Sequence, residues 1–282
     1  METLSLHDPD WLTTFPRRVT PIADEWLPGL LLRCDDANFW RSGTAVRYIM
    51  HTLPRSAPIQ EFNPLIPSDG FLKHLAKTLK IPVNLMEETT YRLELARLSG
   101  VHHPQLDRVH VWRELSICPE CLAQQQVLRR SLMLSSITCC PEHSLRLRSW
   151  CQCRQNLSLF SGGEPFACPD CGLEWKKLPR EKPSWREAAR SQIFFSYYEF
   201  FFLKGTPQIF SAAWKLIGKR RLESEWKYGP GSYKKHVSKK LIGLGYMISL
   251  LIKAGISIEK IVDYAIWCSL EEKTISFPLT SE

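Results

Sequence analysis

The chain has 282 residues, of which 44% are hydrophobic and 11% aromatic, and its formal net charge is +8. This composition excludes a disordered polar chain and leaves room for two or three domains. It also argues against a membrane-spanning helix, because the most apolar runs, Ile193–Leu203 and Leu241–Ile252, have 11 and 12 residues, whereas roughly 20 are needed.

The first segment of the chain begins with acidic residues and no apolar run of signal-peptide length, so we expect the protein to stay in the cytoplasm. Apolar residues at helical spacing predict a helix over Phe71–Leu79, and Pro82 can open a second helix that runs to Glu88. A third helix is predicted for Tyr91–Leu98. Together these elements indicate a helix-turn-helix-like unit.

The second helix of this unit is acidic. It offers Asn84 together with Glu87 and Glu88, whereas a DNA-reading helix normally presents Arg, Lys, Asn or Gln to base edges. Because carboxylates oppose binding to phosphates, we expect the unit to serve in packing or protein docking rather than in reading DNA.

Four pairs of metal-ligand residues follow within 54 residues of the middle segment. The first two pairs are Cys118-Pro-Glu-Cys121 and Cys140-Pro-Glu-His143. Ligands that flank a tight turn can point at one ion, and four such donors make a closed tetrahedral zinc site. We therefore predict that Cys118, Cys121, Cys140 and His143 bind one zinc ion. Cys139 is a rival to Cys140, but the Cys-Pro-x-ligand form favours Cys140.

The other two pairs are Cys151-Gln-Cys153 and Cys168-Pro-Asp-Cys171, and we predict that they bind a second zinc ion. The one-residue gap between Cys151 and Cys153 makes this turn tighter than the usual pair. Each set supplies four protein ligands, whereas a catalytic zinc keeps one position open for water, so both ions are expected to be structural. A disulfide framework is disfavoured, because it belongs to oxidising compartments.

The apolar stretches between the ligand pairs, Leu132–Ile137 and Leu157–Phe160, suit short strands and so predict ribbon-like modules. Cys34 and Cys268 have no partner at metal-ligand spacing, and we expect both to be ordinary buried thiols. Pro179–Pro183 is a plausible linker into the last segment.

The last segment is predicted to be helical. Ile193–Leu203 has aromatic residues on every side of a helix, which indicates a core position. Two further helices are predicted over Lys239–Ala254 and Ile258–Trp267, with Gly255 ending the first and Ser257 capping the second.

A basic segment precedes the last two helices. Lys215–Lys240 holds nine basic residues against two acidic ones, interleaved with three aromatic residues, and Trp214 directly precedes it. Cations that displace condensed counterions, together with rings that can stack, suit a nucleic-acid backbone, and a solvated basic face is the alternative interpretation. The candidate nucleic-acid-binding residues are Lys219, Arg220, Arg221, Lys227, Lys234, Lys235, Lys239 and Lys240.

The predicted fold class is mainly α with small zinc-ribbon or zinc-knuckle modules. We expect an N-terminal domain with the helix-turn-helix-like unit (residues 1–110), tandem zinc-binding modules (111–179) and a C-terminal helical domain with the basic segment (180–282). The sequence has no Walker motif and no credible set of nucleophile, base and orienting residue, so we do not expect an enzyme.

Three motifs resemble those of the TniQ/TnsD proteins, which choose target sites for bacterial transposons. Pro21–Arg33 looks like the opening Pro…Glu…Leu…Arg motif of that family. Leu75–Thr90 resembles its helix-turn-helix stretch. Trp112-Arg113, followed by the cysteine and histidine pairs, resembles its zinc block.

The chain departs from the family pattern in two places. Cys151-x-Cys153 stands where a Cys-x2-Cys pair is common, and Pro28-Gly29 stands where small or aromatic helix residues are expected.

The resemblance implies a transposition targeting adaptor that links a target-recognition element and DNA to an AAA+ ATPase regulator of the TnsC or TniB type. Members either read a DNA attachment site or dock on a CRISPR guide-RNA effector complex. The short chain and the acidic second helix favour docking on an effector, and a homodimer stays open.

Two other functions remain as alternatives. The first is an autonomous zinc-containing, sequence-specific DNA-binding protein, either an attachment-site reader or a transcription regulator. The second is a zinc hydrolase, which the four-ligand sets disfavour.

Overall fold

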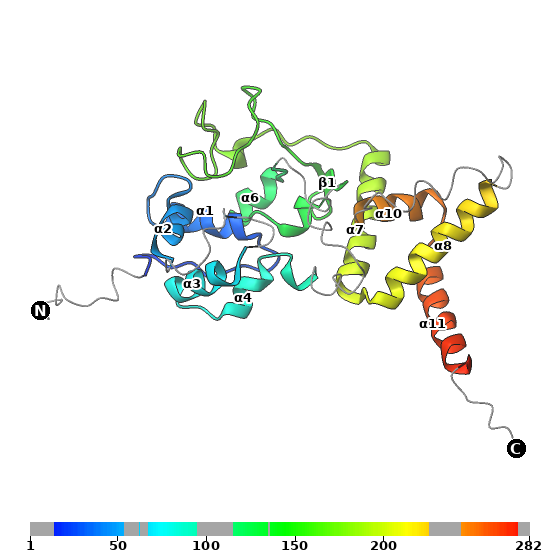
Figure 1. Ribbon diagram of the computed structural model, residues 1–282. Helices are drawn as coiled ribbons and strands as arrows, with labels where there is room; N and C mark the ends of the chain where they lie inside the picture. The colour runs from blue at the N-terminus through cyan, green and yellow to red at the C-terminus, as the bar shows by residue number, and fades with distance from the viewer. Residues whose placement is uncertain are drawn as a thin grey trace, which may run out of the picture. The chain divides into compact units, whose positions relative to one another are not determined.

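A computed structural model describes residues 14–53, 62, 67–94, 115–134, 136–225 and 244–275. These residues are mainly helical, which confirms the predicted fold class, and they form two compact units (Figure 1). The first unit comprises the described residues up to 93 and those from 115 to 192. The second comprises residue 94 and the described residues from 193 onward. The division into three domains stays a prediction.

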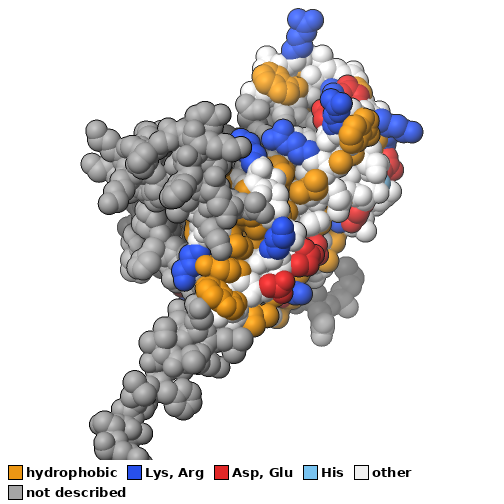
Figure 2. Space-filling view, turned by 90° about the vertical axis from the view of Figure 1, so that its right-hand side faces the viewer, with side chains coloured by type: hydrophobic (Ala, Val, Ile, Leu, Met, Phe, Trp, Pro, Cys, Tyr) orange, Lys and Arg blue, Asp and Glu red, His pale blue; other side chains and the backbone are white. Residues whose placement is uncertain are grey.

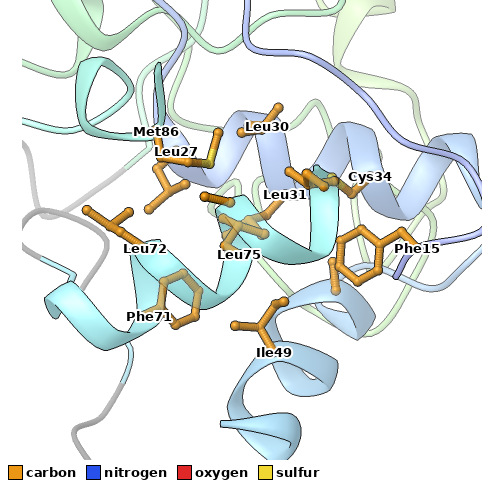
Figure 3. Packing of buried hydrophobic residues seen from close by; sticks show 13 residues of the cluster. Phe15, Leu27, Leu30, Leu31, Cys34, Ile49, Phe71, Leu72, Leu75 and Met86 are labelled. Carbon is orange, nitrogen blue, oxygen red and sulfur yellow. The ribbon is translucent and has the colours of Figure 1, made fainter. Parts of the chain in front are cut away.

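The first unit is built on four N-terminal helices around one apolar core. They are α1 (Leu27–Ala37), α2 (Thr44–Thr52), α3 (Asp69–Leu79) and α4 (Val83–Glu88). On α1, Leu27, Leu30, Leu31 and Cys34 recur at helical spacing, and Figure 3 shows them clustered with side chains of α2, α3 and α4. The burial of Cys34 confirms the prediction for that thiol.

The helices α3 and α4 confirm the first two predicted helices. Ser68 caps α3, because its hydroxyl accepts a hydrogen bond from the Phe71 N–H at 3.2 Å. Lys80 ends α3 in the left-handed conformation, with φ of 55°, and Pro82 directly precedes α4. Residues 92–94 of the third predicted helix are helical, and its remaining residues lie outside the described part of the chain.

Asp35 fixes the start of α2 from within the core. Its carboxylate accepts hydrogen bonds of 2.7 Å from the backbone N–H groups of Gly43 and Ala45. Gly43 has φ of 89° and lies so close to Phe160 that a Cβ atom would be 2.9 Å from the Phe160 Cβ. Only glycine therefore fits this turn without strain.

We expect the stability of the first unit to fall as pH rises through the range in which Asp35 ionises. Burial raises the pKa of Asp35 from 3.8 to about 6, although the N–H groups of Ala45 and Gly43 oppose the shift. A carboxyl with a raised folded-state pKa contributes its full stabilisation below the unfolded pKa and loses it as pH rises through the folded pKa. Denaturant unfolding of wild type and Asp35→Asn at about pH 5 and about pH 7 tests this. If the difference in unfolding free energy between wild type and Asp35→Asn were the same at both pH values, the expectation would be contradicted.

The segment just before α1 is hydrogen-bonded to residues more than 60 positions away. The N–H groups of Trp26 and Leu27 donate to the carbonyls of Leu128 and Thr89, each at 2.8 Å. Asp24, with φ of 59°, accepts from the backbone N–H of Ser131 through its side chain and from Arg130 through its carbonyl. This segment therefore ties the N-terminal helices to the cysteine-rich region, which we define as residues 115–178.

The unusual Gly29 has a packing reason. A Cβ atom at this position would lie 2.8 Å from the Leu128 Cβ and 3.2 Å from its backbone nitrogen. Real Cβ atoms do not approach so closely, so only glycine lets α1 lie against the chain at Leu128.

The cysteine-rich region is built from short elements. They are α6 (Pro119–Gln125), the 3-10 helices η2 (Arg130–Met133) and η3 (Trp175–Lys177), and the antiparallel pair β1 (Cys139–Cys140) and β2 (Leu145–Arg146). The predicted strands over Leu132–Ile137 and Leu157–Phe160 are wrong. The first stretch begins in η2 with three successive buried residues, and the second ends in a turn.

The second unit is helical. After residue 193 it contains the rest of α7 (Trp185–Lys204), followed by α8 (Pro207–Glu225), α10 (Leu244–Lys253) and α11 (Ile258–Ile275). The aromatic side chains at the centre of the run are core, as predicted: Phe194, Tyr198 and Phe201 are each at most 2% exposed. The two end residues of the run, Ile193 and Leu203, are 44% and 66% exposed. Cys268 is only partly buried, which corrects the expectation of a buried thiol.

The turn between α10 and α11 follows the prediction. Gly255 has φ of 62°, and Ser257 caps α11 by accepting from the Lys260 N–H at 3.4 Å. The Tyr197 hydroxyl donates to the carbonyl of Ile256 and ties the turn to α7. None of the described helices is long and apolar enough to cross a lipid bilayer.

Candidate metal centres

The first group of donors gathers where α6 meets the β1–β2 turn. Cys118 directly precedes α6, and Pro119 occupies the first helical position, so Cys121 follows at the end of the first turn. Cys140 ends β1, and its carbonyl accepts from the Ser144 N–H at 2.9 Å, which closes the turn that carries His143.

The donor atoms of this group have the spacing of a tetrahedral site. A zinc ion with bonds of about 2.3 Å to sulfur and about 2.0 Å to nitrogen places its ligands about 3.5–3.8 Å apart. The Sγ atoms of Cys121 and Cys140 are 3.7 Å apart. The Nδ1 atom of His143 lies 3.6, 3.3 and 3.5 Å from the Sγ atoms of Cys118, Cys121 and Cys140. The four residues therefore fit one metal ion.

The second ring nitrogen of His143 is also placed as a metal site requires. Nε2 lies 3.1 Å from the amide oxygen of Gln124 on α6. When Nε2–H donates to this oxygen, Nδ1 is left with the lone pair that faces the three sulfurs. Such an outer partner fixes the ring and the tautomer of a metal-binding histidine.

The neighbouring Cys139 lies outside the group. Its Sγ is 3.6 Å from the Thr138 hydroxyl, and its N–H donates to the hydroxyl of Ser191 at 3.1 Å. The structure thus places Cys140, rather than its rival, among the donors.

Contacts among the thiols of the first group shift their pKa values in opposite directions. Hydrogen bonds from Cys121 and Cys140 lower the pKa of the Cys118 thiol. The same contacts raise the pKa of Cys121 well above its ordinary value, because a second thiolate would face the first. A cation at the centre is what allows all three sulfurs to be ionised together.

The second group comprises Cys151, Cys153, Cys168 and Cys171, whose sulfur atoms all lie within 4.8 Å of one another. The Sγ atoms of Cys151 and Cys171 are 3.5 Å apart, as are those of Cys153 and Cys168. The one-residue gap therefore still delivers both sulfurs of the first pair to the group.

Two local turns build this second group. Arg154, with φ of 71°, donates its N–H to the Cys151 carbonyl at 3.0 Å. Gly172, with φ of 69°, donates to the Cys168 carbonyl, also at 3.0 Å. Burial raises the pKa of the Cys151 thiol to about 12, and a cation at the centre of the group would favour its ionised form.

The predicted nucleic-acid residues are not brought into a site. Lys219, Arg220 and Arg221 fall within α8, and their side chains are not described. Lys227, Lys234, Lys235, Lys239 and Lys240 lie outside the described residues, as do Trp112 and Arg113. The basic segment stays a prediction.

Glu25 and Arg33 belong to the Pro21–Arg33 motif, whose sequence alone indicates no role for either residue. Glu25 is buried, and its two carboxylate oxygens accept from Nε and one terminal nitrogen of Arg33 at 2.7 and 2.9 Å. Arg33 also donates to the Thr20 carbonyl at 2.6 Å, and Glu25 accepts from the Ile22 N–H at 3.0 Å. The motif therefore folds the chain around a buried ion pair.

Comparison with known proteins gives one result for the first unit. Residues 16–147, somewhat less than half of the chain, match the model of the TniQ family. The match includes the Glu25–Arg33 pair and the whole first donor group, and it ends before the second. No curated protein matches the chain.

Proposed function

We propose that the chain is a transposition targeting adaptor of the TniQ family, whose model matches the domain at residues 16–147. Membership implies a part in transposition targeting, together with protein and DNA partners. In the proposed role, the protein links a target-recognition element and DNA to an AAA+ regulator of the TnsC or TniB type in the bacterial cytoplasm. We further propose that the target-recognition element is a CRISPR guide-RNA effector complex.

The two donor groups support a structural rather than a catalytic use of metal. Each offers four protein donors to one ion, and four donors complete a tetrahedral zinc site without a position for water or substrate. We propose zinc at both sites, because three thiolates with one imidazole, or four thiolates, are ligand sets typical of structural zinc. The ions would hold a rigid scaffold for partner binding.

The surface of α4 supports docking on an effector over direct reading of DNA. Met86 faces the core, while Asn84 and Glu88 are exposed. An exposed carboxylate would meet the phosphates of a duplex unfavourably, whereas a protein partner can pair with it. In this proposal, the basic segment contacts the phosphate backbone of DNA.

Exposed apolar side chains on α11 supply a candidate docking surface for the AAA+ regulator. Ile266 and Trp267 are 56% and 50% exposed, and the Trp267 ring stacks on Tyr264 with centroids 5.4 Å apart. Hydrophobic side chains also reach the surface in patches on the face drawn in Figure 2. Large exposed aromatic and aliphatic groups of this kind mark protein interfaces.

Pull-down of the cognate AAA+ ATPase with the full chain, in the presence of ATP and duplex DNA, tests the adaptor role. We expect the wild-type chain to retain the ATPase and the double variant Ile266→Ser, Trp267→Ser to bind it at least about 30-fold more weakly, since an aromatic hot spot contributes about 2 kcal/mol or more. Lys253→Ser, an exposed change on α10 of the same unit, is the matched control.

The outcomes separate the parts of the proposal. No association of the wild-type chain with the ATPase would overturn the adaptor role. If the double variant still binds the ATPase as wild type does, α11 is not the docking surface, but the adaptor role stands. Tight, sequence-specific binding of a duplex without any partner would instead support an autonomous DNA-binding protein.

A further inference from the structure

Phe39 is the most exposed large hydrophobic side chain among the described residues, with 82% of its surface accessible. It follows the last turn of α1, and its φ of 57° lies in the left-handed region. Glycine is usual at this position after a helix, because a side chain with a Cβ atom is strained there. Neither exposure nor backbone conformation favours phenylalanine at this point, so folding does not account for the ring.

The ring is nevertheless held in place. The Arg17 guanidinium lies over it, 4.7 Å from the ring centroid. Arg17 is fixed by Asn38, whose side chain accepts from the Arg17 N–H at 2.7 Å and donates to the Arg17 carbonyl at 2.8 Å. Phe39 is thus presented to solvent as an oriented aromatic surface with a cation beside it.

The charge around Phe39 is positive. Arg17 lies at the ring, Arg18 follows it in sequence and Arg41 is two residues beyond Phe39; all three are exposed, and no described acidic side chain forms an ion pair with any of them. The acidic neighbours are few. Asp35 is buried and holds the start of α2. Asp36 accepts from Gln126 at 3.3 Å, and Glu164 follows Gly163, whose carbonyl accepts from the Ser42 N–H.

We propose that Phe39, with Arg17, Arg18 and Arg41, forms a stacking site for an unpaired base of single-stranded nucleic acid. An exposed ring stacks on any base, and flanking arginines pair with phosphates on either side. A duplex hides the faces of its bases within the stack, so one ring on a helix end suits an unpaired nucleotide. Three exposed arginines against the exposed carboxylates of Asp36 and Glu164 leave a net positive charge, which favours a polyanion over an apolar protein surface.

This site goes beyond the adaptor role, because it does not require the ATPase and it lies outside the predicted basic segment. Loss of single-strand binding would leave ATPase association intact, and loss of ATPase association would leave single-strand binding intact. Fluorescence anisotropy of the full chain tests the site with labelled oligomers of thymidine and of uridine, about 12 nucleotides each, and with a duplex of the same length. The two single strands distinguish a DNA source from an RNA source.

We expect Phe39→Leu, which keeps the bulk but removes the π face, to weaken single-strand binding about tenfold or more and to change duplex binding less than about twofold. Phe39→Tyr should bind like wild type. Phe39→Gly should lose the same affinity while raising Tm by about 2–4 °C, because it relieves the left-handed strain. If the Phe39 ring served only to stabilise the fold, its removal would lower the Tm of the protein.

The matched control is Trp185→Ala. Trp185 is 75% exposed and also has an arginine stacked beside it, Arg186 at 5.4 Å. We expect this variant to bind single strands like wild type. The inference would be overturned if wild type bound neither single strand, if Phe39→Leu kept its affinity, or if Trp185→Ala lost as much. A fall in Tm for Phe39→Gly, or loss of ATPase association with unchanged strand affinity, would overturn it as well.

Discussion

Replacing Cys121 by serine should remove one metal ion per chain and unfold much of the first unit. Structural zinc contributes on the order of 10–16 kcal/mol to a small site, which matches or exceeds the total stability of about 5–15 kcal/mol of an ordinary domain. Cys121 is 3.7 Å from Cys140 and 3.3 Å from His143, so the change removes a donor at the centre of the group. The elements around it have between two and seven residues each, and helices and hairpins this short are not stable by themselves.

Cys139→Ser is the matched control for this variant. Cys139 is adjacent in sequence to a donor and similarly buried, but it lies outside the group, so we expect a loss of only about 1 kcal/mol. Elemental analysis should find two zinc ions in wild type and in the control, and one in Cys121→Ser. Circular dichroism should show a large loss of ordered structure in Cys121→Ser alone. An unchanged melting curve after verified removal of metal by a chelator would refute the structural role.

The second large effect is expected at the buried pair of Glu25 and Arg33. The Glu25 side chain is fully buried and the Arg33 side chain is 16% exposed. Glu25→Gln keeps the shape but leaves the arginine without its counter-charge, and breaking such a pair costs about 3–5 kcal/mol. For a unit of this size we expect Tm to fall by roughly 10 °C, measured by calorimetry on the metal-loaded protein.

Glu174→Gln supplies the same substitution in an exposed setting. Glu174 pairs with Lys176 at 2.7 Å, and both side chains are more than 40% exposed, so water already screens the pair and we expect a loss below about 1 kcal/mol. The double variant Glu25→Leu, Arg33→Met should recover part of the lost stability, because an apolar pair removes the uncompensated charge. Equal effects of Glu25→Gln and Glu174→Gln would show that burial of the pair is unimportant.

The parts of the fold that depend on neighbouring residues were predictable from sequence. The proline after Cys118 opens α6 and so fixes where Cys121 points. In the same way, Gly255 and Ser257 end one helix and cap the next through local hydrogen bonds. Turn geometry is set within four residues, and the spacing of the ligands encodes it directly.

The parts that depend on distant residues were not predictable. The contact of Asp24 with Ser131 spans 107 positions, and no pattern in the sequence around either residue predicts it. The two predicted strands failed for a related reason. Leu132 and Met133 are buried in succession against the unit, whereas a strand would turn alternate residues outward. Phe160 has φ of 56°, which ends any extended run.

The hydrogen bonds of the Asp24–Leu27 segment also constrain how the chain can fold. Its partners are Thr89, Leu128, Arg130 and Ser131. Because the ribosome synthesises these residues long after the segment, the hydrogen bonds cannot form until the partners have left the ribosome. Contacts of such sequence separation slow folding, because loop closure is unfavourable before any contact is made. The attachment of this segment to the cysteine-rich region would therefore be completed only after the first metal ligands have been synthesised, which couples metal capture to a late step in the folding of this unit.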